Sequence, residues 1–540
     1  MNSTSLLVRS ALFLGCLVLS TLPVANADGS APDAAALQAL ADRVYPDSSA
    51  PGLSPTPDRA MCGTSALMTL RGHWSDLPGK TRARLALVLQ QFSRPATQFD
   101  YVSPSGNFCI HYDKAGTNAV DPTDGDGNGV PDYVEEAGAT ADSAWAMEIL
   151  RFGFNPPPSD WNVGGGQGQY DIYIQELSGE SLYGATYPED IAATTTTSYM
   201  EIDNNYTDPI YTSRGKDGLH ATIVHEFFHA IQFGYYSLFD AAWWQEVGAV
   251  RMEDFGYHEV KDYYQYLPSY FDAPDVALDR FFFGDFHPYG SVVFVHNLTA
   301  LYGIKPLRDG WEKLAAQKAW KIDCIDAVLP GGFDQVFPRF AVWNYFTGTR
   351  ARPDYYPAAA DYPLVKTQTV LAQPGLRVSA KGSVSHLAAD YLVFKPGGQA
   401  GGLSVSLTLD ARAKWKVNVL LIRGGDVQIM ETDGSQVRIP EWGQFDEIVI
   451  VPVCLSLTGT GFTYSLTAEV RNGVLKPGLA VGDFNHDGAV NFFDYFAFAE
   501  AFGKAADASG FDPGFDLNAD GVIDLDDFFI FAEHFGETGG

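Results

Sequence analysis

The feature that most constrains the fold is a pair of histidines four residues apart, His225 and His229, in the segment ATIVHEFFHAIQF. On an α-helix this spacing puts both imidazoles on one face, where they can bind a single zinc ion. Glu226 lies about a quarter of the helix circumference away from His225. It can therefore act as general base toward a water molecule whose pKa zinc lowers to about 7. The segment predicts a zinc-binding helix.

A catalytic zinc site has three protein ligands and one open position, so a third ligand is needed. His229 is followed by AIQFGYYS, which excludes the HExxHxxGxxH extension. The next predicted helix, AAWWQEVGAVRMED, offers Glu246, 17 residues after His229, and Glu253. The two lie about 10 Å apart along a helix axis, so only one can bind the same ion. We expect Glu246, because the connection from the first helix is short enough to fold the second helix back against it, and Gly248 and Ala249 beside Glu246 allow close helix approach.

Glu253 is then expected either to hydrogen bond to a metal-binding histidine or to be a solvated surface acid. Hydrolysis also needs a donor for the negative charge that develops on the substrate oxygen. Tyr289 and His287, in the segment DFHPYGSV, are the candidates for this donor.

The N-terminus has the pattern of a secretory signal. The polar segment MNSTSLLVRS precedes the apolar run ALFLGCLVLSTL, which is too short to span a bilayer. Ala25-Asn26-Ala27 fits a signal peptidase site. Residues 1–27 are therefore expected to be a signal peptide, and the mature chain to be secreted without a membrane span.

The formal net charge of -31 over 540 residues limits the partners of the protein. Nucleic acid and anionic membranes need basic surface, so neither is an expected partner. Acidity on this scale favours cations as ligands.

Four cysteines remain after the predicted signal peptide, and none has the spacing of a zinc ribbon or a CxxC redox pair. We therefore expect no cysteine to bind metal. A Cys62–Cys109 disulfide suits a secreted protein, but four cysteines allow three pairings and the sequence does not choose among them. The four are Cys62, Cys109, Cys324 and Cys454.

The pattern along the chain predicts a multidomain α+β protein. Residues 28–100 have helical spacing and form either a propeptide or an N-terminal brace. Residues 101–365 are expected to be a zincin-like catalytic domain, because a strand, SYMEIDN, comes shortly before the HEFFH helix. Residues 366–475 alternate in the manner of a β-sandwich. Residues 476–540 are expected to form a small all-α domain with paired EF-hand-like loops.

An acidic loop in the catalytic region matches the 12-residue EF-hand template, with Gly129 at the sharp turn. It precedes a helix predicted from Tyr133 to Arg151. We expect a structural calcium ion that fixes this helix, with a solvated acidic turn as the alternative. The six ligand positions are Asp124, Asp126, Asn128, Val130, Asp132 and Glu135.

Two similar loops form a tandem repeat with an offset of 33 at the C-terminus. The helices that follow repeat as well, because Phe498-Ala499-Glu500 returns as Phe531-Ala532-Glu533. We expect one calcium ion in each loop. The first loop offers Asp483, Asn485, Asp487, Ala489, Asn491 and Asp494. The second loop offers Asp516, Asn518, Asp520, Val522, Asp524 and Asp527.

The paired loops, over about residues 480–537, resemble a type I dockerin. The resemblance implies folding around calcium and, in cellulosomal proteins, binding to a cohesin. Phe492-Phe493 and Leu525-Asp526 stand at the positions that commonly touch the partner, and this copy has Phe where dockerins favour Leu or Ile.

Residues from about 105 to 350 resemble a family of secreted bacterial metalloproteases of the gluzincin type. The resemblance covers FCIHYD, DGDGNGVPDYVEE, GGGQGQYDIYI, HEFFHAIQFGY, WWQEVGAVRMED and HPYGSVVFVHNL. It implies peptide hydrolysis with Glu226 as base and one zinc held by His225, His229 and the glutamate of WWQE. The spacing to Glu246 is slightly shorter than in the best-known gluzincins.

The sequence therefore predicts a secreted zinc endopeptidase, acting on protein or peptide, whose tail anchors or targets it. The alternative is a non-enzymatic adhesion or scaffold protein with a structural zinc site. An accessory hydrolase of polysaccharide ranks last, because the paired-carboxylate motif of glycosidases is not recognisable.

Overall fold

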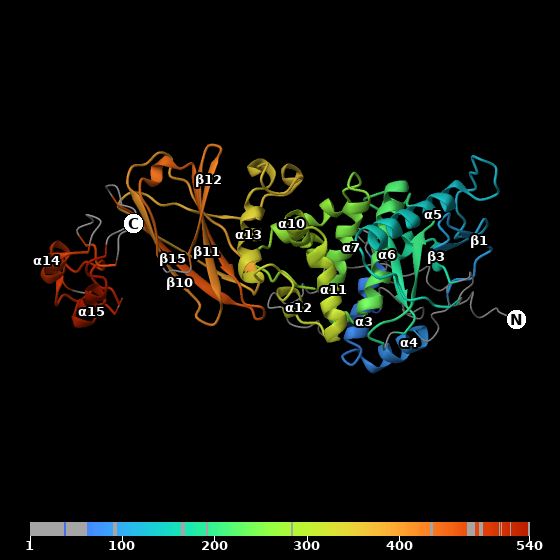
Figure 1. Ribbon diagram of the computed structural model, residues 1–540, viewed down its shortest axis with the longest axis horizontal. Helices are drawn as coiled ribbons and strands as arrows, with labels where there is room; N and C mark the ends of the chain where they lie inside the picture. The colour runs from blue at the N-terminus through green and yellow to red at the C-terminus, as the bar shows by residue number, and fades with distance from the viewer. Residues whose placement is uncertain are drawn as a thin grey trace. The chain divides into compact units, whose positions relative to one another are not determined.

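The computed structural model contains both helices and sheets, and its contacts divide the chain into two compact units (Figure 1). This arrangement confirms the multidomain α+β class. The predicted signal peptide lies outside the described residues. The first unit is Met1–Lys366 with Ser385–Ala388 and Leu455–Gly461, and the second is Thr367–Val384, Ala389–Cys454 and Phe462–Gly540. The structure describes residues 37–38, 41, 62–89, 94–161, 163, 168–190, 193–281, 285–432, 436–471, 481–484, 490–506, 508, 510–518 and 520–537.

The first unit contains a five-stranded sheet in the order β1-β2-β3-β5-β4. The central strands β2, β3 and β5 run parallel, and all of their residues are buried, as in sheets covered on both faces. β1 and β4 are antiparallel edge strands. The strands are β1 (Phe99–Val102), β2 (Phe108–Tyr112), β3 (Tyr170–Gln175), β4 (Gly184–Pro188) and β5 (Ser198–Asp203).

Helix α6 (Lys216–Tyr235) packs against β4, β5, α5 (Asp132–Trp145) and α7 (Ala242–Gly256). Sixteen of its 20 residues are buried, so its polar side chains have to find partners inside the protein. The helix predicted over Tyr133–Arg151 is present as α5 followed by the π-helical turn η2 (Ala146–Arg151).

Gly248 allows α7 to approach α6 closely. A Cβ atom at this position would lie 2.9 Å from Phe228 Cε1 and 3.1 Å from Gln232 Nε2, both on α6. A larger residue would therefore push the helices apart, which is the constraint that the sequence predicted.

The remaining described α-helices of the first unit lie before the sheet or after α7 in the chain. Those before the sheet are α3 (Gly63–Gly72) and α4 (Gly79–Leu89). The α-helices after α7 are α8 (Leu267–Phe271), α9 (His287–Gly290), α10 (Val292–Tyr302), α11 (Lys305–Gln317), α12 (Asp323–Asp326) and α13 (Phe333–Tyr345). The short helices are η3 (Ser178–Glu180), η4 (Phe239–Ala241), η5 (Asp262–Gln265), η6 (Gly348–Arg350) and η7 (Ala359–Asp361).

Arg94 anchors the chain to the sheet just before β1. Its guanidinium is largely buried and pairs with Asp160, Asp171 and Glu189. The attraction of the three carboxylates offsets the free-energy cost of removing the guanidinium from water. Asp171 lies on β3, so the chain is fixed to the sheet from Arg94 onward.

The second unit contains a four-stranded sheet, β13-β10-β15-β7, and a six-stranded sheet built on β12-β11-β14-β9-β6, with β8 paired to β14. Buried and solvent-facing residues alternate along β15, as the sequence alternation predicts. Trp415 and Tyr464 connect the sheets, with ring centroids 6.5 Å apart. The elements are β6 (Gln368–Val370), β7 (Arg377–Val384), β8 (Ala388–Ala389), β9 (Leu392–Phe394), β10 (Gly402–Leu409), β11 (Trp415–Arg423), β12 (Asp426–Thr432), β13 (Gln436–Ile439), η8 (Trp442–Gln444), β14 (Glu447–Cys454) and β15 (Phe462–Arg471).

The C-terminal repeat forms two helices, α14 (Phe492–Ala501) and α15 (Leu525–Glu533). Each begins with a capping box, in which the residue at position 9 of the loop caps the helix and the Asp at position 12 bonds back to it. Phe498 and Phe531 stack between the helices with ring centroids 5.9 Å apart. The duplicated sequence thus gives two equivalent structural units.

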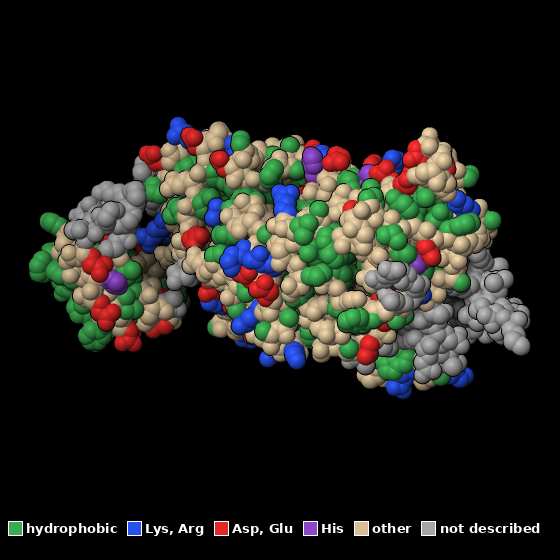
Figure 2. All heavy atoms as spheres, turned by 45° about the vertical axis from the view of Figure 1, so that its right-hand side comes forward, with side chains coloured by type: hydrophobic (Ala, Val, Ile, Leu, Met, Phe, Trp, Pro, Cys, Tyr) green, Lys and Arg blue, Asp and Glu red, His purple; other side chains and the backbone are tan. Residues whose placement is uncertain are grey.

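Large hydrophobic side chains are exposed on these two helices. Phe492, Phe493 and Leu525 are 67%, 69% and 59% exposed. Figure 2 shows hydrophobic side chains gathered on the surface of this part of the chain. Within the described residues, no helix has the length and apolar character needed to cross a bilayer.

Candidate metal centre

Helices α6 and α7 bring the three predicted zinc ligands together. The Nε2 atoms of His225 and His229 are 3.1 Å apart, and the Glu246 oxygens lie 3.5 and 3.7 Å from them. Atoms that bind one tetrahedral zinc at about 2.0–2.1 Å are themselves about 3.4 Å apart. The spacing of these three side chains therefore fits a single ion.

A fourth potential ligand, Cys62, comes from the residue just before α3. Its Sγ lies 3.6 Å from His229 Nε2, and the ligand atoms of all four residues lie within 4.8 Å of one another. All four residues are buried. The structure thus corrects our expectation that no cysteine takes part in the metal centre. Spacing rules missed Cys62 because its neighbours in space are more than 160 residues away in the sequence.

The predicted disulfide is not formed. Cys62 and Cys109 are both buried and neither is in a disulfide, and the same holds for the other two cysteines of the described chain, Cys324 and Cys454.

Each histidine is oriented by a hydrogen bond from its other ring nitrogen. His225 Nδ1 lies 2.6 Å from Glu253 Oε1, and His229 Nδ1 lies 2.8 Å from Gln232 Oε1. Protonation of Nδ1 leaves Nε2 free to bind metal. Glu253 is therefore a buried partner of a histidine and not a solvated surface acid. Gln232 was missed, although it lies three residues after His229 on the same helix face.

The electrostatics of the cluster favour a bound cation. Glu246 Oε2 is buried and accepts no hydrogen bond from the described residues. Burial holds the pKa of His229 below its ordinary value, which favours the neutral, metal-binding imidazole. Burial also raises the pKa of the Cys62 thiol, and the Glu226 and Glu246 carboxylates raise it further. A divalent ion among these groups would give the Glu246 oxygen a partner and would reduce the repulsion between the Glu226 and Glu246 carboxylates. The residues therefore fit a metal.

Glu226 lies beside this cluster but is not part of it. Its Oε2 lies 2.8 Å from the Thr186 hydroxyl on the edge strand β4 and accepts a hydrogen bond from Thr64 at 3.0 Å. Glu226 is buried, and its carboxylate lies between α6 and the edge strand β4. Its place beside the ligand cluster agrees with the expected geometry, and its role as a base stays a prediction.

A cleft opens onto the cluster, with an empty space of about 340 Å³ that includes open solvent. Tyr289, one of the two predicted oxyanion donors, lines it. The other, His287, is buried and donates from Nε2 to the Ala277 carbonyl at 3.0 Å, so it supports the scaffold. The residues that line the cleft are Cys62, Tyr183, Ala221, Thr222, His225, Glu226, Glu253, Asp262, Tyr266 and Tyr289.

A second group of potential ligands, Asp100, Cys109 and His111, lies on β1 and β2. Both ring nitrogens of His111 are engaged by carboxylates, at 2.7 Å from Asp100 and 3.0 Å from Asp171. Asp171 also pairs with Arg94. This group therefore forms part of the ion-pair network that anchors the chain to the sheet.

The acidic loop before α5 has the turn that the EF-hand template requires. The Asp124 carboxylate accepts backbone hydrogen bonds from Gly127, Asn128 and Gly129, and these bonds, led by the one from Gly129, lower its pKa. Gly129 has a φ of 92°, which favours glycine. The Asn128 amide bridges Asp126 and Glu135, so loop positions 3, 5 and 12 converge.

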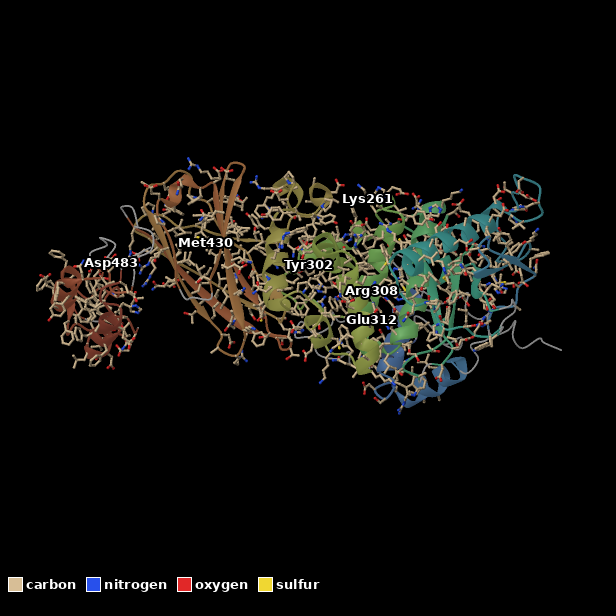
Figure 3. The ribbon with its side chains drawn as sticks, viewed as in Figure 1. Lys261, Tyr302, Arg308, Glu312, Met430 and Asp483 are labelled. Atoms are coloured by element: carbon tan, nitrogen blue, oxygen red, sulfur yellow. The ribbon has the colours of Figure 1, made fainter. Side chains whose placement is uncertain are left out.

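The second C-terminal loop has the same local geometry. Gly521, with a φ of 90°, donates from its backbone to Asp516 at 2.8 Å. The fully buried Asp527 accepts from the backbone of Asn518 at 3.0 Å. In the first C-terminal loop, Asp483, labelled in Figure 3, is buried and Asp494 caps α14. The positions Asn485, Asp487 and Ala489 lie outside the described residues.

No protein-family model matches the chain, and no curated protein matches it. Solved structures give only weak similarity. The lysozyme inhibitor PliG of Aeromonas hydrophila is 16% identical, over 19% of this chain and 97% of that chain, with a TM-score of 0.16. The Yersinia pseudotuberculosis-derived mitogen is 15% identical, over 18% and 88%, with a TM-score of 0.15. A mutant type II Cohesin-X-Dockerin complex from Acetivibrio cellulolyticus is 19% identical, over 24% and 85%, with a TM-score of 0.12. These similarities assign neither a family nor a function.

The geometry predicts unequal effects of the two α7 glutamates on zinc binding. Glu246→Ala removes a ligand, whereas Glu253→Ala removes only the hydrogen bond to His225, which costs about 10- to 100-fold in affinity. After dialysis against buffered free zinc, elemental analysis should find Glu246→Ala largely empty and Glu253→Ala still able to fill at higher zinc. Equal zinc affinity of the two variants would contradict the ligand assignment.

Proposed function

We propose that the protein is a secreted zinc endopeptidase in which Glu226 is the general base. The observation that carries this proposal is the position of Glu226, buried beside a His-His-Glu cluster and held by Thr186 of the edge strand. A purely structural metal site has no use for a carboxylate in that position. The cleft that reaches the cluster supports access by a substrate.

His225, His229 and Glu246 would hold the zinc ion, which when bound would supply the Lewis acidity that polarises a substrate carbonyl and lowers the pKa of water. Glu226 then takes the proton from the attacking water and delivers it to the leaving amine. Tyr289, in the cleft lining, is the donor for the developing oxyanion. His225 and His229 keep their orientation through Glu253 and Gln232.

The edge strand β4 gives the substrate its binding mode. Among the described residues β5 is the only strand that pairs with β4, so the outer edge of β4 is the one at which an extended peptide would add as a strand. The antiparallel edge strand beside a metal-binding helix, with a third ligand on the next helix, supports a zincin-like domain of the gluzincin type.

A structural zinc site in an adhesion or scaffold protein is the second candidate. It is favoured by Cys62, because a fourth protein ligand would close the coordination sphere. Hydrolysis by a variant that lacks the cysteine distinguishes the two candidates.

We further propose that calcium ions occupy the loop before α5 and the two C-terminal loops. In the loop before α5 and in the second C-terminal loop, the convergent side chains and the glycine turns support this assignment, and the first C-terminal loop is included because its sequence repeats in the second. The exposed Phe492, Phe493 and Leu525 support a role for the dockerin-like tail in binding a protein partner, with a cohesin-like domain or cell-surface scaffold as the candidate.

Loss of the base should abolish hydrolysis without loss of zinc. We compare Cys62→Ala with Cys62→Ala/Glu226→Gln on an unfolded protein substrate, so that the cysteine affects neither chain. General base catalysis contributes about 10²- to 10⁴-fold, and the rate should fall by that factor at equal zinc content. Equal rates in the two chains would rule out Glu226 as the base.

The second C-terminal loop should lose one calcium ion when its first ligand is removed. Asp516→Ala removes a carboxylate of the loop, whereas Asp512→Ala, a matched control, removes one that only accepts from Gly514. Equilibrium dialysis should give one calcium fewer per chain for Asp516→Ala alone, and a calcium-selective chelator should lower the melting temperature of the parent chain. Identical calcium content in both variants would refute the site.

A further inference from the structure

The three residues Cys62, Gly63 and Thr64 together contact the ligand cluster, Glu226 and the edge strand β4. Cys62 lies in the ligand cluster, 3.6 Å from His229 Nε2. Thr64 donates from its hydroxyl to Glu226 Oε2 at 3.0 Å. All three residues are buried, so one short segment covers both the metal ligands and the base.

The same segment lies against the edge strand that we assign to the substrate. The Thr186 backbone N–H donates to Thr64 Oγ1 at 2.7 Å, so a group that could pair with a substrate is already engaged. Gly63 fits closely beside β4, because a Cβ atom there would lie 2.8 Å from Ala185 Cβ and 3.0 Å from Leu182 Cδ1. Gly63 and Thr64 begin α3, so the start of this helix covers part of the edge at which an added peptide strand would pair.

We propose that residues 62–64 are an inhibitory segment that keeps the peptidase latent in the intact chain. Cys62 takes the coordination position that must stay open for catalysis, and the Thr64 hydroxyl hydrogen bonds to the carboxylate of the proposed base, Glu226. This inference rests on the proposed peptidase function and adds its regulation: residues 62–64 must withdraw before a substrate can bind.

The architecture around the segment fits its withdrawal. Leu70, Leu77 and Leu85, on and between α3 and α4, form a hydrophobic cluster with Leu37 and Ala41, so this N-terminal region has a small core of its own. The chain is then anchored to the sheet again at Arg94 by three carboxylates. The sequence left residues 28–100 as either a propeptide or an N-terminal brace, and these contacts favour the propeptide.

The first test compares the full-length parent with Cys62→Ala and Cys324→Ala. Cys324 is a matched control, because it is also buried but bonds to Gln317 of α11 and belongs to neither group of potential metal ligands among the described residues. If about one chain in a hundred is open at any time, releasing the segment raises the rate about 100-fold. We expect that increase for Cys62→Ala only. A parent that already cleaves as fast as Cys62→Ala would overturn latency while leaving the peptidase function intact.

A second pair of variants acts on the segment without removing a metal ligand. Gly63→Ala forces the segment away from β4, whereas Gly79→Ala, at the start of α4, meets nothing within 4 Å. Gly63→Ala should therefore raise the rate several-fold and Gly79→Ala should not. Equal rates for both would show that closeness to the edge strand does not hold the segment in place.

Cobalt substitution gives a readout that does not depend on activity. Cobalt in the full-length chain should show thiolate-to-metal charge-transfer absorption in the near ultraviolet, which Cys62→Ala loses and Cys324→Ala keeps. A parent without this absorption would refute Cys62 as a ligand. Absorption in the parent together with an inactive Cys62→Ala chain would instead mean a structural site, in which case both the peptidase function and the latency fail.

Discussion

The close packing of α7 on α6 is the contact on which the centre depends. Gly248 removes the side chain that would separate the helices, and this brings Glu246 to within 3.7 Å of both histidine Nε2 atoms. The same contact lets the Gln232 amide, which orients His229, donate to the Gln245 carbonyl on α7. One small residue thus sets the ligand geometry and part of its support, because a packed interior transmits a shift at one contact to its neighbours.

The sequence predicted those parts of the site that are local in the chain. The four-residue spacing of His225 and His229 is a property of one helix, and Glu246 followed from a short connection between two helices. The sequence also predicted the turn at Gly129 and the long helix after it, because each depends on a few neighbouring residues. In the same way, the alternation along β15 predicted which face of that strand is buried.

The parts that the sequence did not predict are those made by long-range contacts. Cys62 and Thr64 reach the centre only because α3 packs beside β4, and no spacing rule connects positions more than 120 residues apart. The sequence left two roles possible for Glu253, a partner of a histidine and a surface acid. Burial decides between these roles, and burial is a property of the packed helices. No local signal marked Cys62, because its burial and its neighbours are properties of the fold, and the sequence allowed a Cys62–Cys109 disulfide as one of three pairings.

The latency that we propose implies two states of the centre that differ in one segment. With residues 62–64 in place, a metal ion would have four protein ligands and Glu226 would be engaged by Thr64. With the segment withdrawn, the ion would have an open position next to Glu226, and the edge of β4 would be uncovered. X-ray absorption at the zinc edge of the full-length chain tests this account most directly. It should give one sulfur at about 2.3 Å together with nitrogen and oxygen at about 2.0–2.2 Å. A shell of nitrogen and oxygen alone, or a chain that binds no zinc, would contradict it.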